Sequence, residues 1–268
     1  WVKDGEDGWF NGYYDNHGRK VEGVMDESVR MMLTGQVFAI MSGTATEDQV
    51  ESICRSADKY LYDQKAGGYR LNTNFHEEKF DLGRMFGFAY GEKENGAVFS
   101  HMAVMYANAL YKQGFIKEGY KVLKTLLDTA MDFDRSRMYP GVPEYFDNDG
   151  RGLYSYLTGA ASWYMLTMIT SVYGVHGELG GLVIEPALMP QQYNEKGDAK
   201  VSLEFAGHGF DILVHNPDKL EPGDAHVKRA LCDDVKVENV TGNSVRIPKH
   251  AIEMLSTDKC HTVEIYIE

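Results

Sequence analysis

Four chemically different side chains lie within nine residues near the middle of the chain: Lys93, Glu94, Asn95 and His101. Glycines at positions 91 and 96 flank the first three residues and predict a loop. The apolar pattern that follows predicts a helix from about residue 98, which puts His101 in its first turn. Loops on a rigid scaffold often carry binding sites, and helix N-termini favour anions. We therefore expect the floor of a pocket that holds an anion and a polar substrate.

Each of these residues also has a purely structural interpretation. A histidine at a helix start is more often a surface or capping residue than a ligand. Lys93 and Glu94 could form a solvent-exposed charge pair, and Asp81 and Arg84 upstream could bind a sugar or form a salt bridge. The residues alone leave these alternatives open.

Five helices are predicted to position this loop. Apolar residues recur with a helical period in each, and Thr46 followed by Gln49 predicts a capping box at the start of the second. The predicted helices cover residues 26–42, 46–61, 98–113, 116–130 and 153–173. The last helix lies in a stretch without charged residues, and we expect it to be buried on all sides in a soluble protein rather than to cross a membrane.

A different pattern begins after the two glycines at positions 180 and 181, where the apolar period changes to two. Strands are predicted at residues 182–186, 201–205, 210–214, 235–240, 245–247 and 263–267, with a hairpin turn at 207–209. Paired helices with long loops at one end favour an α/α toroid. We therefore predict a mainly α chain with a β tail: residues 1–178 form the carboxyl-terminal part of an (α/α)6 toroid, and residues 179–268 form a small antiparallel β domain.

Composition narrows the class of partner. The net charge of −13 argues against nucleic acid or an anionic membrane, because both are bound by clustered Lys and Arg. Cys54, Cys232 and Cys260 are odd in number and lack zinc-site spacing, so neither a disulfide framework nor a metal site is expected. Because the chain starts at Trp1 within a dense aromatic segment, we expect it to be part of a longer polypeptide.

Four motifs resemble the inverting glycoside phosphorylases of glycoside hydrolase family ninety-four, typified by cellobiose phosphorylase. Residues 14–18 are similar to that family's Tyr-Asp-Asp/Asn-x-Gly loop, and residues 93–101 to its Lys-Glu-Asn-Gly-Gly-x-Phe-x-His motif. Residues 144–145 resemble its Glu-Pro-Tyr loop, and residues 157–163 its Trp-Leu-Thr-Gly-Thr-Ala-x-Trp signature. The likeness covers about residues 9–217. The sequence of residues 83–110 is more similar to the β-1,2-oligoglucan phosphorylases than to cellobiose phosphorylase itself.

The resemblance implies an (α/α)6 barrel in the whole protein, with a β-sandwich before it and a β domain after it. It implies that phosphate is bound by His101, Thr158 and Gly159. It also implies that Glu94 contacts the acceptor sugar, and it favours substrate binding by these loop residues: Glu94, Lys93, Asn95 and Tyr145. Tyr156 and Ala160 depart from the signature, which leaves the acceptor sugar open.

The chemistry of phosphorolysis fits this set of residues. A phosphorylase replaces the activated water of an inverting hydrolase with phosphate, so one carboxylic acid is enough. The imidazole, the hydroxyl and the backbone amides can hold the anion by hydrogen bonds, with no metal or cofactor required. The general acid is expected upstream of this chain. Within it, the candidates are Glu94, Asp15 and Glu144.

The expected function is therefore part of an inverting phosphorylase that cleaves a β-linked gluco-oligosaccharide, preferably of β-1,2 type, to give α-glucose 1-phosphate. An inverting glycoside hydrolase and a non-catalytic carbohydrate-binding or remnant module remain the alternatives. The expected partners are an oligosaccharide, phosphate and the remainder of the same polypeptide, with a homodimer left open. A cytoplasmic location is expected because phosphorolysis conserves bond energy in a sugar phosphate. Without its acid, the chain is expected to be inactive alone.

Overall fold

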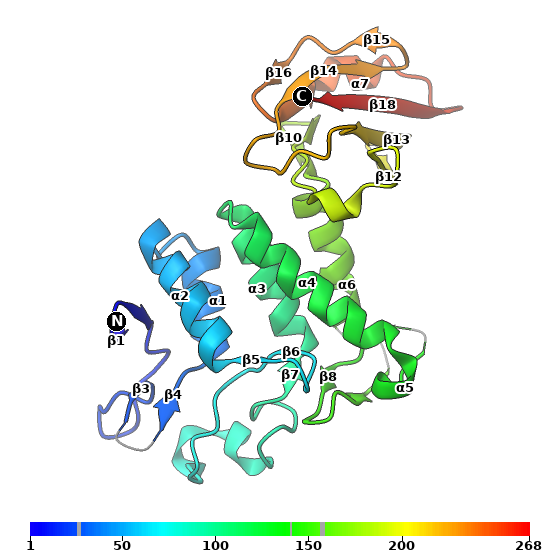
Figure 1. Ribbon diagram of the computed structural model, residues 1–268. Coiled ribbons are helices and arrows are strands. Elements are labelled where there is room, and N and C mark those ends of the chain that lie inside the picture. Colours follow the sequence, from blue (N-terminus) through cyan, green and yellow to red (C-terminus); the bar gives the residue numbers. More distant parts are fainter. Residues whose placement is uncertain (26–27, 140, 156–158) are drawn as a thin grey trace. The chain divides into compact units, whose positions relative to one another are not determined.

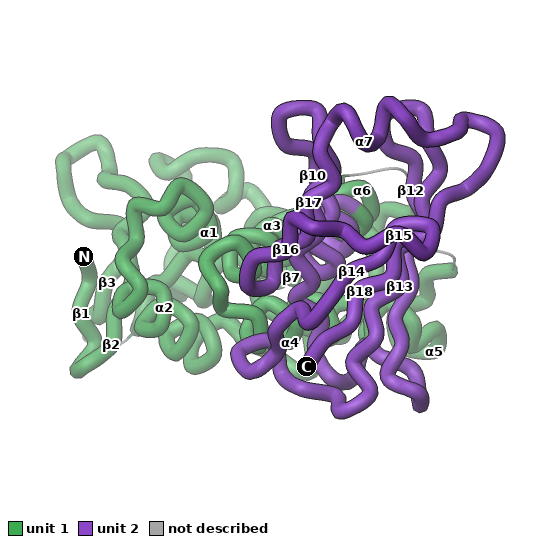
Figure 2. The backbone as a smooth tube through the Cα atoms, turned by 90° about the horizontal axis from the view of Figure 1, so that it is seen from above, with its two compact units in different colours: residues 1–165 green, residues 166–268 purple. Residues whose placement is uncertain are grey.

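The computed structural model describes residues 1–25, 28–139, 141–155 and 159–268 (Figure 1). Its chain divides into two compact units, Trp1–Met165 and Leu166–Glu268 (Figure 2). The first unit holds most of the helices and the second most of the long strands. Each unit is described by itself.

The helices of the first unit form two helical hairpins. Their bounds are α1 Leu33–Met41, α2 Glu47–Tyr60, α3 Ser100–Lys112, α4 Ile116–Met131 and the short α5 Phe133–Ser136. The predicted capping box is confirmed: the Thr46 hydroxyl accepts from the Gln49 amide at 3.4 Å, and Gln49 accepts from the Thr46 amide at 3.0 Å. The short connections from α1 to α2 and from α3 to α4 agree with the predicted pairing.

The central helix of the first unit is α3, which packs against both α1 and α4. Nearly all of its residues from Ala103 to Tyr111 are buried, in agreement with a core helix rather than a surface one. The ring of Tyr106 is fully enclosed, and its hydroxyl lies 3.5 Å from the sulfur of Cys54 on α2. The start of α3, where His101 lies, is thus fixed by a packed core.

Three pairs of short antiparallel strands lie between or before the helices of the first unit. The pairs are β1 Val2–Asp4 with β2 Asp7–Trp9, β3 Gly23–Val24 with β4 Val29–Arg30, and β5 Tyr62–Asp63 with β6 Gly68–Tyr69. The helix predicted at 26–42 begins only at Leu33, because the residues before it pair as β4 and as a bridge between Met32 and Asn72. Residues 26 and 27 lie outside the described part.

A three-stranded antiparallel sheet joins the start of α3 to a pair of strands more than forty residues further along the chain. It consists of β7 Val98–Phe99, β8 Tyr145–Phe146 and β9 Gly152–Leu153, in that order. Because β7 leads directly into α3, the pairing fixes where the helix begins. The Ser100 amide also donates to the carbonyl of Glu144 at 2.9 Å, which extends the contact into the first turn of α3.

The long buried helix predicted at 153–173 is only partly correct. Leu153 belongs to β9, α6 covers Gly159–Thr167, and a π-helical segment continues it over Met168–Val172. Within α6, Met165 and Leu166 are 65% and 45% exposed, so the helix is not buried on all sides in the described chain. A stretch without charged residues is hydrophobic, but its sequence does not show whether another segment packs over it.

The second unit contains two sheets and one short helix. The strands are β10 Val175–Glu178, β11 Gly181–Ile184, β12 Asp198–Phe205, β13 His208–His215, β14 Val227–Cys232, β15 Val235–Lys236, β16 Val240–Thr241, β17 Ser244–Ile247 and β18 Cys260–Ile267, and the helix is α7 Lys249–Glu253. The sheet orders are β10-β11-β17-β16 and β12-β13-β18-β14-β15.

The predicted hairpin is confirmed as β12 and β13, with its turn at Ala206 and Gly207. The prediction of a wholly antiparallel domain is wrong at one place, because β13 and β18 pair in parallel. The chain between them supplies β14 to β17 and α7, which gives the long crossover that parallel pairing needs.

Over the residues that the structure describes, the chain is about 32% helical and 27% strand, so it is mixed rather than mainly α. The (α/α)6 toroid and the domain limits at 178 and 179 stay predictions. Of the helices in the described ranges, none has the length and apolar character needed to cross a lipid bilayer.

The capping box gives a first testable prediction. Thr46→Ala removes the side-chain acceptor for the Gln49 amide, so we expect the free energy of unfolding of the first unit to fall by about 1 kcal/mol. All three tryptophans lie in this unit, so tryptophan fluorescence during urea unfolding reports on it. Thr44→Ala, which removes an exposed hydroxyl outside the helix, is the control; an equal loss in both variants would contradict the prediction.

Candidate functional site

The loop from Gly91 to Gly96 is held by its own hydrogen bonds. Gly91 and Gly96 have φ angles of 95° and 75°, and a Cβ on Gly96 would lie 2.1 Å from the ring of Tyr90. The side-chain amide of Asn95 donates to the Phe88 carbonyl at 2.8 Å, and its oxygen accepts from Asn72 at 3.2 Å. Asn95 was predicted to bind substrate; in the structure its side chain is engaged in shaping the loop.

In the described chain, Lys93 and Glu94 contact different residues and do not pair with each other. The ammonium of Lys93 lies 4.4 Å from the ring centroid of Tyr154 and 5.6 Å from that of Phe88. The hydrogen bond with the Tyr154 side chain is the chief cause that raises the pKa of Lys93. One carboxylate oxygen of Glu94 is 3.5 Å from Arg84, and the other is buried without a hydrogen-bond partner among the described residues. Glu94 thus has one buried acceptor oxygen that the described residues leave unsatisfied.

Tyr145 is buried on β8 and its hydroxyl is already engaged. It donates to Glu92 at 2.9 Å, and its ring stacks on that of Phe99 at 6.4 Å between centroids. Burial, and then the bond to Glu92, raise the pKa of Tyr145. We conclude that Tyr145 holds the loop through Glu92. The sequence offered a signal for Glu92, which directly precedes the Lys-Glu-Asn-Gly motif.

His101 lies in the first turn of α3, as predicted, and contacts the start of α6. A Cβ added to Gly159 would lie 2.5 Å from Cε1 of the imidazole, so the glycine backbone lies directly against the ring. The ring of Trp163, one turn further along α6, has its centroid 5.7 Å from that of His101. The structure therefore brings together two motifs separated by more than fifty residues of sequence.

The imidazole of His101 is half-buried, and its Nε2 is one of the buried polar atoms without a hydrogen-bond partner in the described ranges. Burial lowers the pKa of His101. Buried polar atoms are normally hydrogen-bonded, so an unsatisfied nitrogen indicates a missing partner. Thr158, the third predicted phosphate residue, lies outside the described residues.

The acid candidates within the chain have distinct surroundings. Asp15 accepts from the amides of His17 and Arg19 at 2.8 and 2.9 Å and pairs with the Arg19 side chain. The backbone bond from Arg19, above all, lowers the pKa of Asp15 to about 2, so this carboxyl stays ionised and is unsuited as an acid. Arg84, for which the sequence allows either sugar binding or a salt bridge, pairs with the acid candidate Glu94.

A buried carboxyl that the motif analysis missed is Glu22. It accepts from the amides of Gly12 and Met32 at 2.6 and 2.7 Å and is fully buried. Burial raises the pKa of Glu22 to about 7, against the lowering effect of these two bonds. Its contacts join the amino-terminal loop to the residue that precedes α1. Nothing in the local sequence marks it as buried, because its partners are backbone groups.

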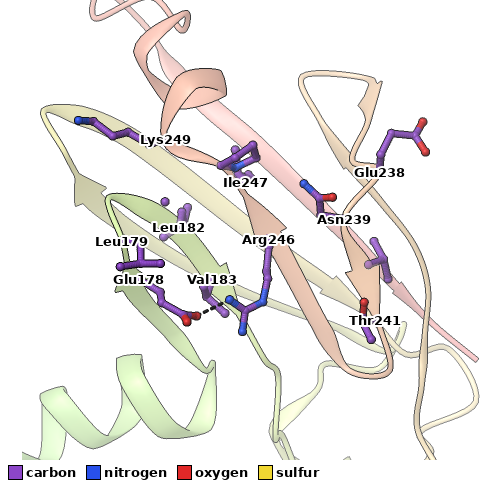
Figure 3. A pocket seen from close by; sticks show the side chains of 13 residues that line it. Glu178, Leu179, Leu182, Val183, Glu238, Asn239, Thr241, Arg246, Ile247 and Lys249 are labelled. Carbon is purple, nitrogen blue, oxygen red and sulfur yellow. Dashed lines mark hydrogen bonds and ion pairs between the residues drawn. The ribbon is translucent and has the colours of Figure 1, made fainter.

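Two of the hollows in the described chain differ in their lining. One lies on the four-stranded sheet of the second unit, where Arg246 pairs with Glu178 across the floor (Figure 3). No aromatic side chain is among the described residues that line it. The other lies in the first unit beside the Lys93–Glu94 loop, has a volume of about 460 Å³, and is lined by the rings of Phe80, Phe86, Phe88 and Tyr90.

Comparison with known proteins places these residues in a family context. The family model described as glycosyl hydrolase 94 superfamily, catalytic domain, matches residues 1–174. A cellobionic acid phosphorylase from Neurospora crassa is 28% identical over 76% of this chain and 28% of its own length. An N,N'-diacetylchitobiose phosphorylase from Vibrio proteolyticus is 26% identical over 82% of this chain and 28% of its own length. A solabiose phosphorylase from Paenibacillus borealis is 24% identical over 85% of this chain and 30% of its own length.

The chain therefore spans less than a third of the length of the curated relatives it matches. Among solved structures, a family GH92 α-mannosidase from Bacteroides thetaiotaomicron matches 97% of this chain and 27% of its own, with 13% identity and a TM-score of 0.29. A likeness of this size supports no conclusion about function or about the barrel.

The contact between Gly159 and His101 gives a second prediction. Gly159→Ala places a methyl group where the imidazole now lies, so the ring must move. We expect the ring resonances of His101 in NMR spectra to shift and its pKa, lowered by burial, to rise towards the ordinary value of about 6.5. Met165→Ala, which changes an exposed side chain on the same helix, is the control. An unchanged His101 titration in Gly159→Ala would contradict the contact.

The buried carboxyl of Glu22 gives a third prediction. Its pKa rises from about 4.5 in the unfolded chain to about 7 in the fold, so folding favours the protonated form. The contribution of Glu22 to the free energy of unfolding of the first unit should therefore be largest below about pH 4.5. It should fall by up to about 3 kcal/mol as the pH rises through 7.

The glutamine of Glu22→Gln cannot ionise, so the fall in the free energy of unfolding should disappear in this variant. Unfolding is followed by tryptophan fluorescence between pH 5 and pH 8. Glu195→Gln, at an exposed site, is the control and should keep the wild-type pH dependence. If Glu22→Gln keeps the pH dependence of the wild type, ionisation of the Glu22 carboxyl does not destabilise the fold, which contradicts the prediction.

Proposed function

Because this chain belongs to the glycosyl hydrolase 94 superfamily, we propose that it is the carboxyl-terminal part of an inverting glycoside phosphorylase. The proposed reaction cleaves a β-linked gluco-oligosaccharide with inorganic phosphate and releases α-glucose 1-phosphate and a shortened sugar. Curated relatives carry the name phosphorylase, which supports this class of reaction. The family catalytic domain alone is compatible with both hydrolysis and phosphorolysis.

The observation that carries the proposal is the imidazole of His101: its Nε2 is unsatisfied among the described residues, and its Cε1 and Nδ1 atoms lie against Gly159. A histidine with a lowered pKa is neutral near pH 7, so it has one N–H to donate and one lone pair to accept. Phosphate offers acceptor oxygens and, in its monoanion and monohydrogen forms, an O–H group, and can therefore pair with either nitrogen. The absence of a side chain at Gly159 allows the imidazole to lie directly against the start of α6.

In the proposed reaction, a phosphate oxygen attacks the anomeric carbon from the face opposite the glycosidic bond. The bond between that carbon and the glycosidic oxygen breaks, and a carboxylic acid gives its proton to the leaving oxygen, so a β linkage yields an α phosphate. We propose that the acid lies in the remainder of the polypeptide, as the family resemblance implies; within this chain, the lowered pKa of Asp15 makes that carboxyl a poor acid. Without the acid, this chain is inactive by itself.

Glu94 is the proposed contact to the acceptor sugar, because its free carboxylate oxygen can accept from a sugar hydroxyl. Lys93, held over the Tyr154 ring, is the proposed second contact on the same loop. The proposed preference for β-1,2-linked glucan rests on the sequence of residues 83–110 alone. No cofactor or metal is part of the proposal, and a cytoplasmic location follows from the value of sugar phosphates to metabolism.

A hydrolase would need a second carboxylate positioned to activate water at the place proposed for phosphate. The curated relatives carry the name phosphorylase, which favours phosphorolysis over hydrolysis. A non-catalytic carbohydrate-binding module would bind sugar without any dependence on phosphate.

The fourth prediction tests the phosphate site in the full-length polypeptide that contains this chain. His101→Ala removes a hydrogen-bond donor to the nucleophile, so we expect phosphate-dependent release of glucose 1-phosphate to fall at least about 100-fold. β-1,2- and β-1,4-gluco-oligosaccharides are the substrates, and the better one identifies the branch. His226→Ala, an exposed histidine of the second unit, is the control. Full activity of His101→Ala, or glucose released without phosphate, would refute the proposal.

A further inference from the structure

The hollow lined by Phe80, Phe86, Phe88 and Tyr90, called here the aromatic hollow, adjoins the loop that carries Glu94. Asn95 connects the two: its side chain lines the hollow, and its amide donates to the backbone of Phe88. The ring of Phe88 is also flanked by Arg84 and Lys93, at 5.3 and 5.6 Å from its centroid. The hollow therefore lies beside the loop that carries the proposed acceptor contacts.

The rings of the aromatic hollow are unequally covered. Phe86 is buried and packs on Phe75, with 5.6 Å between the ring centroids, so it forms the floor. Phe80, on a short 3₁₀ turn at the rim, is 68% exposed. A large apolar ring left in water beside a hollow indicates a surface for a ligand with an apolar face.

Polar groups surround these rings. His76 and Glu78 are exposed at the same hollow, while Glu77 is already paired with Lys79 at 3.2 Å. An aromatic ring with hydrogen-bonding side chains around it matches a sugar ring, which has apolar C–H faces and a rim of hydroxyls. The hollow on the second unit has paired charges but no such ring among its described lining residues, so it lacks this combination (Figure 3).

We propose that the aromatic hollow is an additional acceptor subsite, in which Phe80 stacks on a sugar unit beyond the one bound by Glu94. This inference rests on the proposed function, which sets the direction in which the sugar chain runs. It narrows the substrate class to β-linked oligosaccharides of three or more units, rather than disaccharides alone. Phe80 touches the distal sugar and takes no part in bond cleavage.

The test is the binding of β-linked gluco-oligosaccharides of two to five units to the full-length polypeptide, measured by calorimetry without phosphate so that no reaction occurs. We expect affinity to increase from the disaccharide to the longer sugars. Phe80→Ala should weaken binding of the longer sugars about 3- to 10-fold and leave the disaccharide within about two-fold of wild type. Phe80→Trp, which keeps a stacking ring, should restore binding of the longer sugars.

Tyr139→Ala is the matched control, because Tyr139 is 77% exposed and lies outside the aromatic hollow. An affinity that does not depend on sugar length, or longer sugars bound equally by wild type and Phe80→Ala, would overturn the subsite. If Phe80 is instead covered by another part of the polypeptide, Phe80→Ala will lower the unfolding temperature and leave sugar binding unchanged, which also overturns it. Length-dependent binding that needs Phe80, without phosphate-dependent cleavage, would support the subsite and refute phosphorolysis.

Discussion

The arrangement of the candidate site depends on backbone pairing between β7, β8 and β9. These strands have two residues each, yet they join segments that begin at positions 98, 145 and 152. Phe99 pairs with Tyr145, and Tyr145 pairs with Leu153, so the loop before α3, the Tyr145 loop and the segment before α6 meet at one place. Side chains then reinforce the pairing: Tyr145 stacks on Phe99 and donates to Glu92.

The motif residues at this place have two kinds of role: some hold the loop, and others keep an unsatisfied polar atom. Asn95 and Tyr145 have their hydrogen-bonding groups engaged inside the protein, so they fix the loop and the start of the helix. Glu94 and His101 each keep one buried polar atom without a partner in the described chain. An unsatisfied buried acceptor and an unsatisfied buried nitrogen are costly unless a ligand completes them. We regard these two atoms as the positions where sugar and phosphate are recognised.

Local features could be predicted from the sequence more reliably than burial or partners. The capping box at Thr46, the position of His101 in the first turn of its helix and the β12–β13 hairpin follow from short-range patterns. The parallel pairing of β18 with β13, the exposure of Met165 and the burial of Glu22 depend on contacts distant in sequence. The role of Tyr145 could not be read from the motif for the same reason, since its partner Glu92 is more than fifty residues away.

The measurement that tests the account most directly is a phosphate titration of the full-length polypeptide, with the His101 ring nitrogens observed by ¹⁵N NMR. If Nε2 of His101 binds the nucleophile, saturating phosphate will shift this resonance, and sulfate will compete for the same shift. The other histidine resonances should stay in place. A His101 resonance that does not move at phosphate concentrations supporting turnover would contradict the central claim.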